Sequence, residues 1–264
     1  MNTVRVVTLA LVAYFIGFIP SSGGVVHLQE PPSWRTGTAI ITFLDPQSAI
    51  TVGADSKDSR SGNEDECKIV KLGHSTYFTA GGFVAGRTFD SRKLAREAFL
   101  EAEKSSETIR LTQRRIKAAL NKEFSAWRKN QPQVYRTHFD SIKGLTLILF
   151  GAEQGDLFIY TRRFELKTPD ATEVEVTGHD CISSFCKRGK PLLTFHGHHT
   201  AITEYDRRNP AAGLRIEETA TWIRSAMAAQ IRETPAHVGG QIDIISIRPT
   251  GQVEWKQKKE KCEA

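Results

Sequence analysis

Runs of apolar, β-branched residues open the patterned part of the chain. Residues 37–43 (Gly-Thr-Ala-Ile-Ile-Thr-Phe) and 49–56 (Ala-Ile-Thr-Val-Gly-Ala-Asp-Ser) flank the proline-containing turn 45–48. This pattern predicts a β-hairpin. The runs 68–72 and 77–82 have the same character and predict a third and a fourth strand.

The pattern then changes to helical spacing. Apolar side chains recur every three or four positions over 83–104, over 108–129 and over 216–231, which predicts three helices. Pro132 is expected to end the second helix.

The other apolar runs predict more strands. A second hairpin joins 144–151 to 157–160, residues 173–177 alternate like a strand, and two strands follow the last helix at 241–247 and 253–255. Residues 179–213 have no readable pattern.

The order of elements indicates the fold class. Strands, two helices, strands, one helix and strands do not alternate as in a parallel βαβ sheet. The order suits an α+β protein, in which antiparallel sheets pack face to face with helices outside.

Composition is that of a globular protein of one domain or at most two. The chain has 264 residues, of which 39% are hydrophobic and 25% charged, with a formal charge of +6 and a pI of about 9.2. An excess of basic residues can bind nucleic acid or an anionic membrane surface. Since no nucleic-acid motif accompanies it, we expect a solvated basic surface and no nucleic-acid partner.

The N-terminus resembles an export signal. Arg5 precedes the uncharged apolar run 6–19, and Pro-Ser-Ser-Gly-Gly follows at 20–24. The run is short for a membrane span, which needs about 20 residues. We expect 1–24 to be a signal peptide of a secreted or periplasmic protein. In the alternative, it is a retained anchor and the protein's only contact with a membrane.

The rest of the chain divides by composition. Residues 25–37 are polar and proline-rich and are expected to form a linker or propeptide, 38–256 a single domain, and 257–264 a charged tail.

The cysteines fit an oxidising compartment only loosely. Cys181 and Cys186 could close a small loop, whereas Cys67 and Cys262 are too far apart in sequence to judge. Four unpaired thiols are the alternative. No Cys-x-x-Cys pair indicates zinc or redox chemistry.

Polar residues at the predicted strand ends carry the candidate chemistry. Thr38 follows Gly37 at the head of the first strand, Asp55 ends the second, and Lys68 opens the third. If these strands are neighbours, their ends bring together a nucleophile, an acid and a cation.

Four motifs in order carry a family resemblance: Gly-Thr-x-Ile, Gly-Ala-Asp-Ser-Lys, Lys-Ile-x-Lys-Leu and Ala-Gly-Gly-Phe-Val-Ala-Gly. They resemble the β subunits of the proteasome and the bacterial HslV protease, which are N-terminal nucleophile hydrolases. The resemblance runs from Gly37 through the helix after Gly82, with thinner matches to about Trp255. It implies a four-layer αββα sandwich, a ring-type homo-oligomer and no cofactor.

The resemblance implies that Thr38 is the nucleophile. A threonine hydroxyl is a weak nucleophile until a base takes its proton. When the threonine is the first residue, its own α-amine, with a pKa near 8, can be that base. This chemistry requires cleavage of the Gly37–Thr38 bond. An ordinary strand threonine is the alternative, and Thr36 is a rival first residue that lacks a preceding glycine.

The resemblance also implies the supporting roles. Asp55 orients and charge-balances the site, and Lys68, with Lys71 as the alternative, lowers the basicity of the nucleophile. A backbone N–H at Gly82, or at Gly81 beside it, supplies the oxyanion donor.

Two stretches depart from the family pattern. Where the family has a serine after a Gly-Ser-Gly turn, residues 176–179 read Val-Thr-Gly-His, so His179 is a candidate supporting residue. Where the family has Arg-Asp-x-x-Ser-Gly-Gly, Glu233 takes the aspartate position and no serine precedes the glycine pair 239–240. An altered supporting shell lowers activity, so an inactive relative is the alternative.

Two other clusters of polar residues are weaker candidates for a functional site. His196-Gly197-His198-His199 suggests a metal, but no carboxylate is spaced to complete a site, and we expect none. Ser183 and Ser184 near His179 and Asp180 suggest a serine triad, but there is no Gly-x-Ser-x-Gly elbow.

The sequence therefore predicts a threonine-type peptidase or amidase that acts on a peptide or protein through an acyl-enzyme. Small and apolar residues near Ala80 and Val84 favour apolar side chains beside the scissile bond. A non-catalytic scaffold or binding subunit of the same fold is the alternative. Because proteasomes are usually cytosolic, a cytoplasmic location is the alternative to export.

Overall fold

The computed structural model describes residues 38–58, 66–186, 190–211, 213–260 and 262. The chain separates into a unit that ends at Pro31 and a unit from Pro32 to Ala264, to which all of these residues belong. The expected signal peptide 1–24 and linker 25–37 lie outside the described residues.

Two antiparallel five-stranded sheets form the centre of this unit. The first has the order β10-β9-β2-β1-β8, with the bounds β1 (Ala39–Asp45), β2 (Ala49–Ala54), β8 (Leu192–Gly197), β9 (Asp243–Ile247) and β10 (Val253–Gln257). The second has the order β3-β4-β5-β6-β7, with the bounds β3 (Ile69–Lys71), β4 (Thr76–Gly82), β5 (Gly144–Glu153), β6 (Asp156–Glu165) and β7 (Glu175–Ile182).

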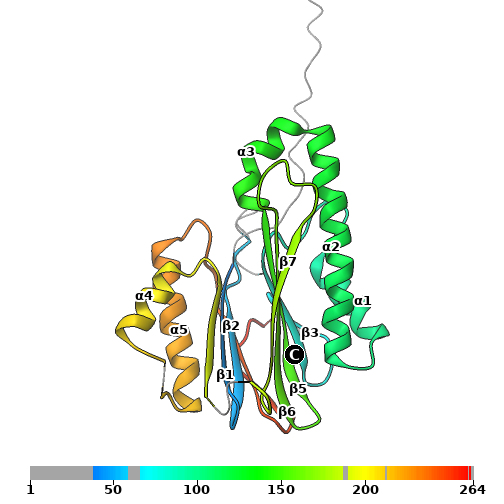
Figure 1. The fold of residues 1–264 in the computed structure, drawn as a ribbon. Helices are drawn as coiled ribbons and strands as arrows, with labels where there is room; N and C mark the ends of the chain where they lie inside the picture. The colour runs from blue at the N-terminus through cyan, green and yellow to red at the C-terminus, as the bar shows by residue number, and fades with distance from the viewer. Residues whose placement is uncertain (1–37, 59–65, 187–189, 212, 261, 263–264) are drawn as a thin grey trace, which may run out of the picture. The chain divides into compact units, whose positions relative to one another are not determined.

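The helices cover the outer faces of the two sheets. Figure 1 shows α1 (Ser91–Glu101), α2 (Ser105–Asn130) and α3 (Pro132–Ile142) beside the second sheet. It shows α4 (Thr200–Arg208) and α5 (Ile216–Glu233) on the opposite side, beside the first. The expected α+β class with an αββα sandwich is confirmed.

Strand β1 shows why the layers form. Ile40 and Leu44 pack between the sheets, whereas Ala39, Ile41 and Phe43 pack on the other face, in the cluster that α5 joins. Because successive side chains of a strand point to opposite faces, a strand covered on both sides is apolar throughout. That is why residues 39–44 of β1 are apolar except for Thr42.

One helix prediction was wrong at its start. The first helix begins at Ser91 rather than in the eighties, because the Asp90 carboxylate accepts the N–H groups of Arg92 and Lys93 and starts the helix there. The second helix ends at Asn130, just before Pro132, as predicted. Pro132 also begins α3, a helix that the pattern did not predict, since proline suits the first turn of a helix.

Both pairs of cysteines form disulfides, Cys67–Cys262 and Cys181–Cys186, so four unpaired thiols was the wrong alternative. Within the predicted charged tail 257–264, Lys259 and Cys262 are buried. Among the described residues, no helix is both long and apolar enough to cross a bilayer.

Candidate active site

Three strand ends meet at one end of the sandwich and bring Thr38, Asp55 and Lys68 together. Thr38 precedes β1 and Asp55 follows β2, which pairs with β1. Lys68 precedes β3 of the facing sheet, and its Nζ donates to Thr38 Oγ1 at 3.0 Å. All three residues are buried.

The Asp55 carboxylate is held by backbone N–H groups. Ala39 N donates to Oδ1 at 2.9 Å, and Gly239 N and Lys57 N donate to Oδ2 at 3.1 and 3.2 Å. Burial raises the pKa of Asp55, and the Lys68 charge and these N–H groups oppose that rise. Since Ala39 follows Thr38, the carboxylate fixes the backbone beside the candidate nucleophile.

Lys68 holds its ammonium away from water. Burial lowers the pKa of Lys68, and the Asp55 charge opposes that shift. Lys71, the alternative, lies exposed at the far end of β3. It is thus Lys68, and not Lys71, that bonds to Thr38.

Gly239 is a site residue that sequence reasoning missed. It lies between α5 and β9, and its carbonyl accepts Ser56 N and Lys57 N at 3.1 Å each, while its N–H bonds to Asp55. In the sequence, the pair Gly239-Gly240 stands out only because no serine precedes it. A contact made by a backbone N–H needs no particular side chain. The only sequence signal for the contact of Gly239 with Asp55 is therefore the glycine pair itself.

Glycines from both sheets surround Thr38. A Cβ on Gly81 would lie 3.4 Å from Thr38 Cβ, and one on Gly197 would lie 1.9 Å from the Thr38 carbonyl oxygen. The same oxygen accepts His198 N at 3.0 Å. Gly82 has a φ of 89°, a conformation that favours glycine, so its backbone turns where β4 ends beside the site.

A cleft of about 500 Å³ opens from these glycines between the two sheets. Gly81, Gly82 and Gly197 line it next to Thr38, and side chains of β5, β6, β7 and β8 form its walls. Drug-sized ligands bind in clefts of this size, where most of their surface can be buried.

The two predicted supporting residues, His179 and Glu233, do not belong to the cluster of Thr38, Asp55 and Lys68. His179 stands on β7 and lines the cleft wall. Glu233 ends α5 on an exposed surface and lines a separate depression beside α4. Glu233 thus lies away from the cluster of Thr38, Asp55 and Lys68, and its supporting role stays a prediction; after α5 it is Gly239 that contacts Asp55.

The three histidines at 196, 198 and 199 each contact a different group and do not converge on one point. His196 Nε2 bonds to Thr194 Oγ1 at 2.9 Å, His198 stacks on His237 with ring centroids 4.8 Å apart, and His199 Nδ1 bonds to the Gly197 carbonyl at 2.7 Å. No group of three or more metal-ligating side chains converges in the described part of the chain. The hydroxyls of Ser183 and Ser184 bond instead to Asp156.

Comparison with known proteins identifies only the fold. No protein-family profile and no curated protein matches the sequence. The structure is similar to Anbu from Hyphomicrobium sp. strain MC1, with a TM-score of 0.51 and 13% identity over 86% of this chain and 89% of that one. A Gly-1 mutant of that protein gives the same values. Anbu (ancestral beta-subunit) from Yersinia bercovieri gives a TM-score of 0.49 at 13% identity, over 85% and 88% of the two chains.

These neighbours correct the family assignment made from the motifs. They are Anbu proteins, whose fold is proteasome-like but distinct from the proteasome β and HslV family, so that assignment was wrong. The four motifs occur at strand ends and turns that the fold needs. They therefore indicated the architecture without separating the families that share it.

Proposed function

We propose that the protein is a threonine-type hydrolase of peptide or amide bonds, with Thr38 as its nucleophile once the Gly37–Thr38 bond is cut. One observation carries the proposal: Lys68 Nζ donates to Thr38 Oγ1 at 3.0 Å beside the buried Asp55 carboxylate. A buried lysine placed on a hydroxyl is costly unless its charge is used, and groups with shifted pKa values gather at reactive sites.

The three residues have separate roles in this reaction. The new α-amine of Thr38 takes the proton from Oγ, and the Lys68 ammonium stabilises the negative charge that develops on that oxygen. Asp55 balances the charge of Lys68 and, through Ala39 N, fixes the direction in which Thr38 points.

The acyl-transfer steps follow from this arrangement. Oγ attacks the substrate carbonyl, whose oxygen turns towards a backbone N–H of Gly81 or Gly82. The C–N bond breaks, the departing amine takes the proton held by the α-amine, and an ester to Thr38 remains. Water then attacks the ester, releases the acid and restores the hydroxyl. The substrate chain lies in the cleft that Gly81, Gly82 and Gly197 border.

We also propose export to an oxidising compartment. Pairing of all four cysteines supports it, since disulfides persist mainly outside the reducing cytosol. Assembly into a homo-oligomer stays a prediction.

Mass spectrometry of the mature protein, combined with peptide hydrolysis, tests the proposal. We expect a chain that begins at Thr38 and cleaves fluorogenic peptides, and a Thr38→Ala variant that folds but loses at least a thousandfold in kcat. Thr38→Ser is the matched control, because it keeps a hydroxyl and should retain part of the activity. An intact Gly37–Thr38 bond together with no hydrolysis supports the scaffold alternative. Full activity of Thr38→Ala refutes the proposed mechanism.

A further inference from the structure

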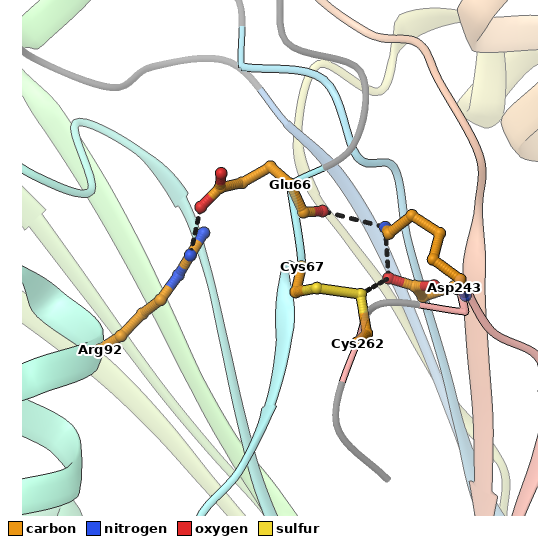
Figure 2. The surroundings of a disulfide bond; sticks show 6 residues. Glu66, Cys67, Arg92, Asp243 and Cys262 are labelled. Atoms are coloured by element: carbon orange, nitrogen blue, oxygen red, sulfur yellow. Dashed lines mark hydrogen bonds and ion pairs between the residues drawn. A yellow bond between two sulfur atoms is a disulfide. The ribbon is translucent and has the colours of Figure 1, made fainter.

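The end of the chain reaches back to the segment that carries Lys68. Beyond β10, Lys259 and Cys262 are 2% and 4% exposed. Cys262 forms a disulfide with Cys67, the residue directly before Lys68 (Figure 2). A segment 195 residues further along the chain is thus covalently attached next to the candidate catalytic lysine.

Lys259 adds a second attachment at the same place. Its Nζ pairs with Asp243 Oδ2 at 2.5 Å and donates to the Glu66 carbonyl at 2.9 Å. Its backbone N–H donates to Asp243 Oδ1 at 3.0 Å. One buried ammonium therefore joins the start of β9 to the residue two before Lys68.

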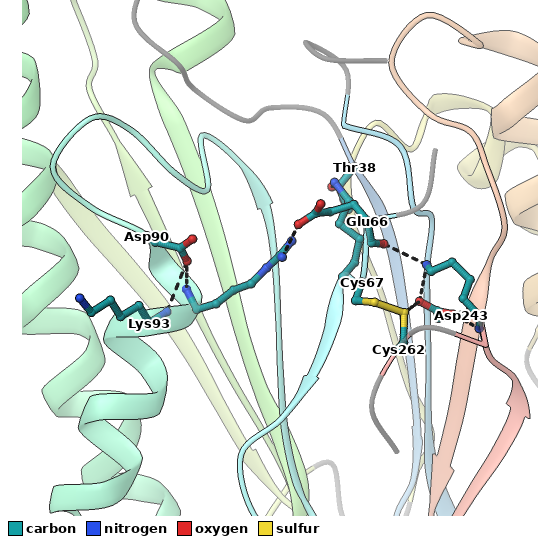
Figure 3. Close-up of polar contacts among 10 residues, drawn as sticks. Thr38, Glu66, Cys67, Asp90, Lys93, Asp243 and Cys262 are labelled. Carbon is teal, nitrogen blue, oxygen red and sulfur yellow. Dashed lines mark hydrogen bonds and ion pairs between the residues drawn. A yellow bond between two sulfur atoms is a disulfide. The ribbon is translucent and has the colours of Figure 1, made fainter. Parts of the chain in front are cut away.

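Glu66 is also held from two other sides. Its carboxylate pairs with Arg92 on α1, as Figure 2 shows. Its N–H donates to Ser56 O at 2.9 Å, beside Asp55. Figure 3 draws Thr38 and Asp90 together with this network, and Lys68, the residue after Cys67, donates to Thr38 Oγ1 at 3.0 Å.

The sheet itself gives Lys68 little support. Strand β3 has three residues, and its pairing with β4 begins at Ile69, opposite Thr79. Lys68 lies just outside that ladder, so its position depends on what holds Glu66 and Cys67. The tail supplies both the disulfide and the Lys259 bonds to this short segment.

We propose that Lys259 and the Cys67–Cys262 disulfide are positioning groups for the reaction, which hold the 66–68 segment so that the Lys68 ammonium stays on Thr38 Oγ1. This inference rests on the proposed function. It predicts a loss in the chemical step when the tail is released, because the cleft that binds substrate lies on the β5–β8 side and is not touched.

The test compares the two disulfides in the mature protein. Cys67→Ser/Cys262→Ser is expected to lower kcat for a fluorogenic peptide at least tenfold, with KM changed less than twofold. Cys181→Ser/Cys186→Ser is the matched control and should leave both constants unchanged. Treatment of the wild type with a dithiol should reproduce the loss. The reductant gives two electrons and two protons to the sulfurs and closes to a cyclic disulfide, and reoxidation should restore kcat.

Unchanged kcat in a folded Cys67→Ser/Cys262→Ser protein overturns the proposal. If that variant does not fold, Lys259→Gln, which keeps the disulfide, decides in the same way. Hydrogen exchange separates this inference from the proposed function, because it needs no turnover. Faster exchange of the amides of residues 68–70 in the Cys67→Ser/Cys262→Ser protein than in the control supports positioning even if the wild type hydrolyses nothing, and equal protection overturns it.

Discussion

The two disulfides should differ strongly in what they contribute to stability. Cys67 and Cys262 are 195 positions apart, whereas Cys181 and Cys186 are five apart. Without a cross-link, the unfolded chain gains loop entropy that grows with the logarithm of loop length. That relation gives a loss of about 5 kcal/mol for the long loop and about 2 kcal/mol for the short one.

Urea unfolding of the two double Cys→Ser proteins measures this difference. The free energy of unfolding should fall by about 3 kcal/mol more in Cys67→Ser/Cys262→Ser than in Cys181→Ser/Cys186→Ser. The m-value should also rise in the former, because a chain freed from the long loop exposes more surface when it unfolds. Equal losses, or a larger loss for the short loop, would refute the entropic reasoning.

Three further predictions concern single residues. Lys259→Met should lower the free energy of unfolding by about 3–5 kcal/mol in urea, because it leaves the buried Asp243 charge unpaired, and adding Asp243→Leu should recover most of that loss. Burial lowers the pKa of His196 to about 4. Since the unfolded side chain protonates near pH 6.5, stability should fall by about 3 kcal/mol between pH 6.5 and 4 in urea titrations, and His196→Gln should flatten that fall. Gly197→Ala should abolish hydrolysis and reduce soluble yield, because the new methyl carbon would lie 1.9 Å from the Thr38 carbonyl oxygen at a φ of 73°.

The sequence contained much of the fold because its strand signals are local. Largely apolar runs such as 39–44 and 145–150 arise where both faces of a strand are covered, and proline-containing or polar turns separate them. Residues 179–213 were unreadable because β8 is only partly buried and α4 buries a single side chain, Ile202. Neither element carries a strong apolar period.

The candidate site could be predicted where side chains at strand ends define it. Thr38, Asp55 and Lys68 are the first or last polar residues beside apolar runs, so the pairing of the strands brings them together. The contribution of Gly239 is a backbone N–H, which no side-chain pattern reveals. The Cys67–Cys262 bond depends on the return of the chain after β10, and nothing local to either cysteine indicates it.

Two lysine–aspartate pairings lie at the same end of the sandwich, and only one of them touches the candidate nucleophile. Asp55 follows β2 and Asp243 begins β9, on strands that pair directly, with Ala54 opposite Asp243. Taking charges out of water costs free energy that apolar residues would save, so a buried pair needs a reason other than stability. For Lys68 that reason is its hydrogen bond to Thr38, the proposed nucleophile. The pair of Lys259 with Asp243 makes no contact with the cleft, and its ammonium instead bonds to Glu66 O, which places the second pair in support of the first.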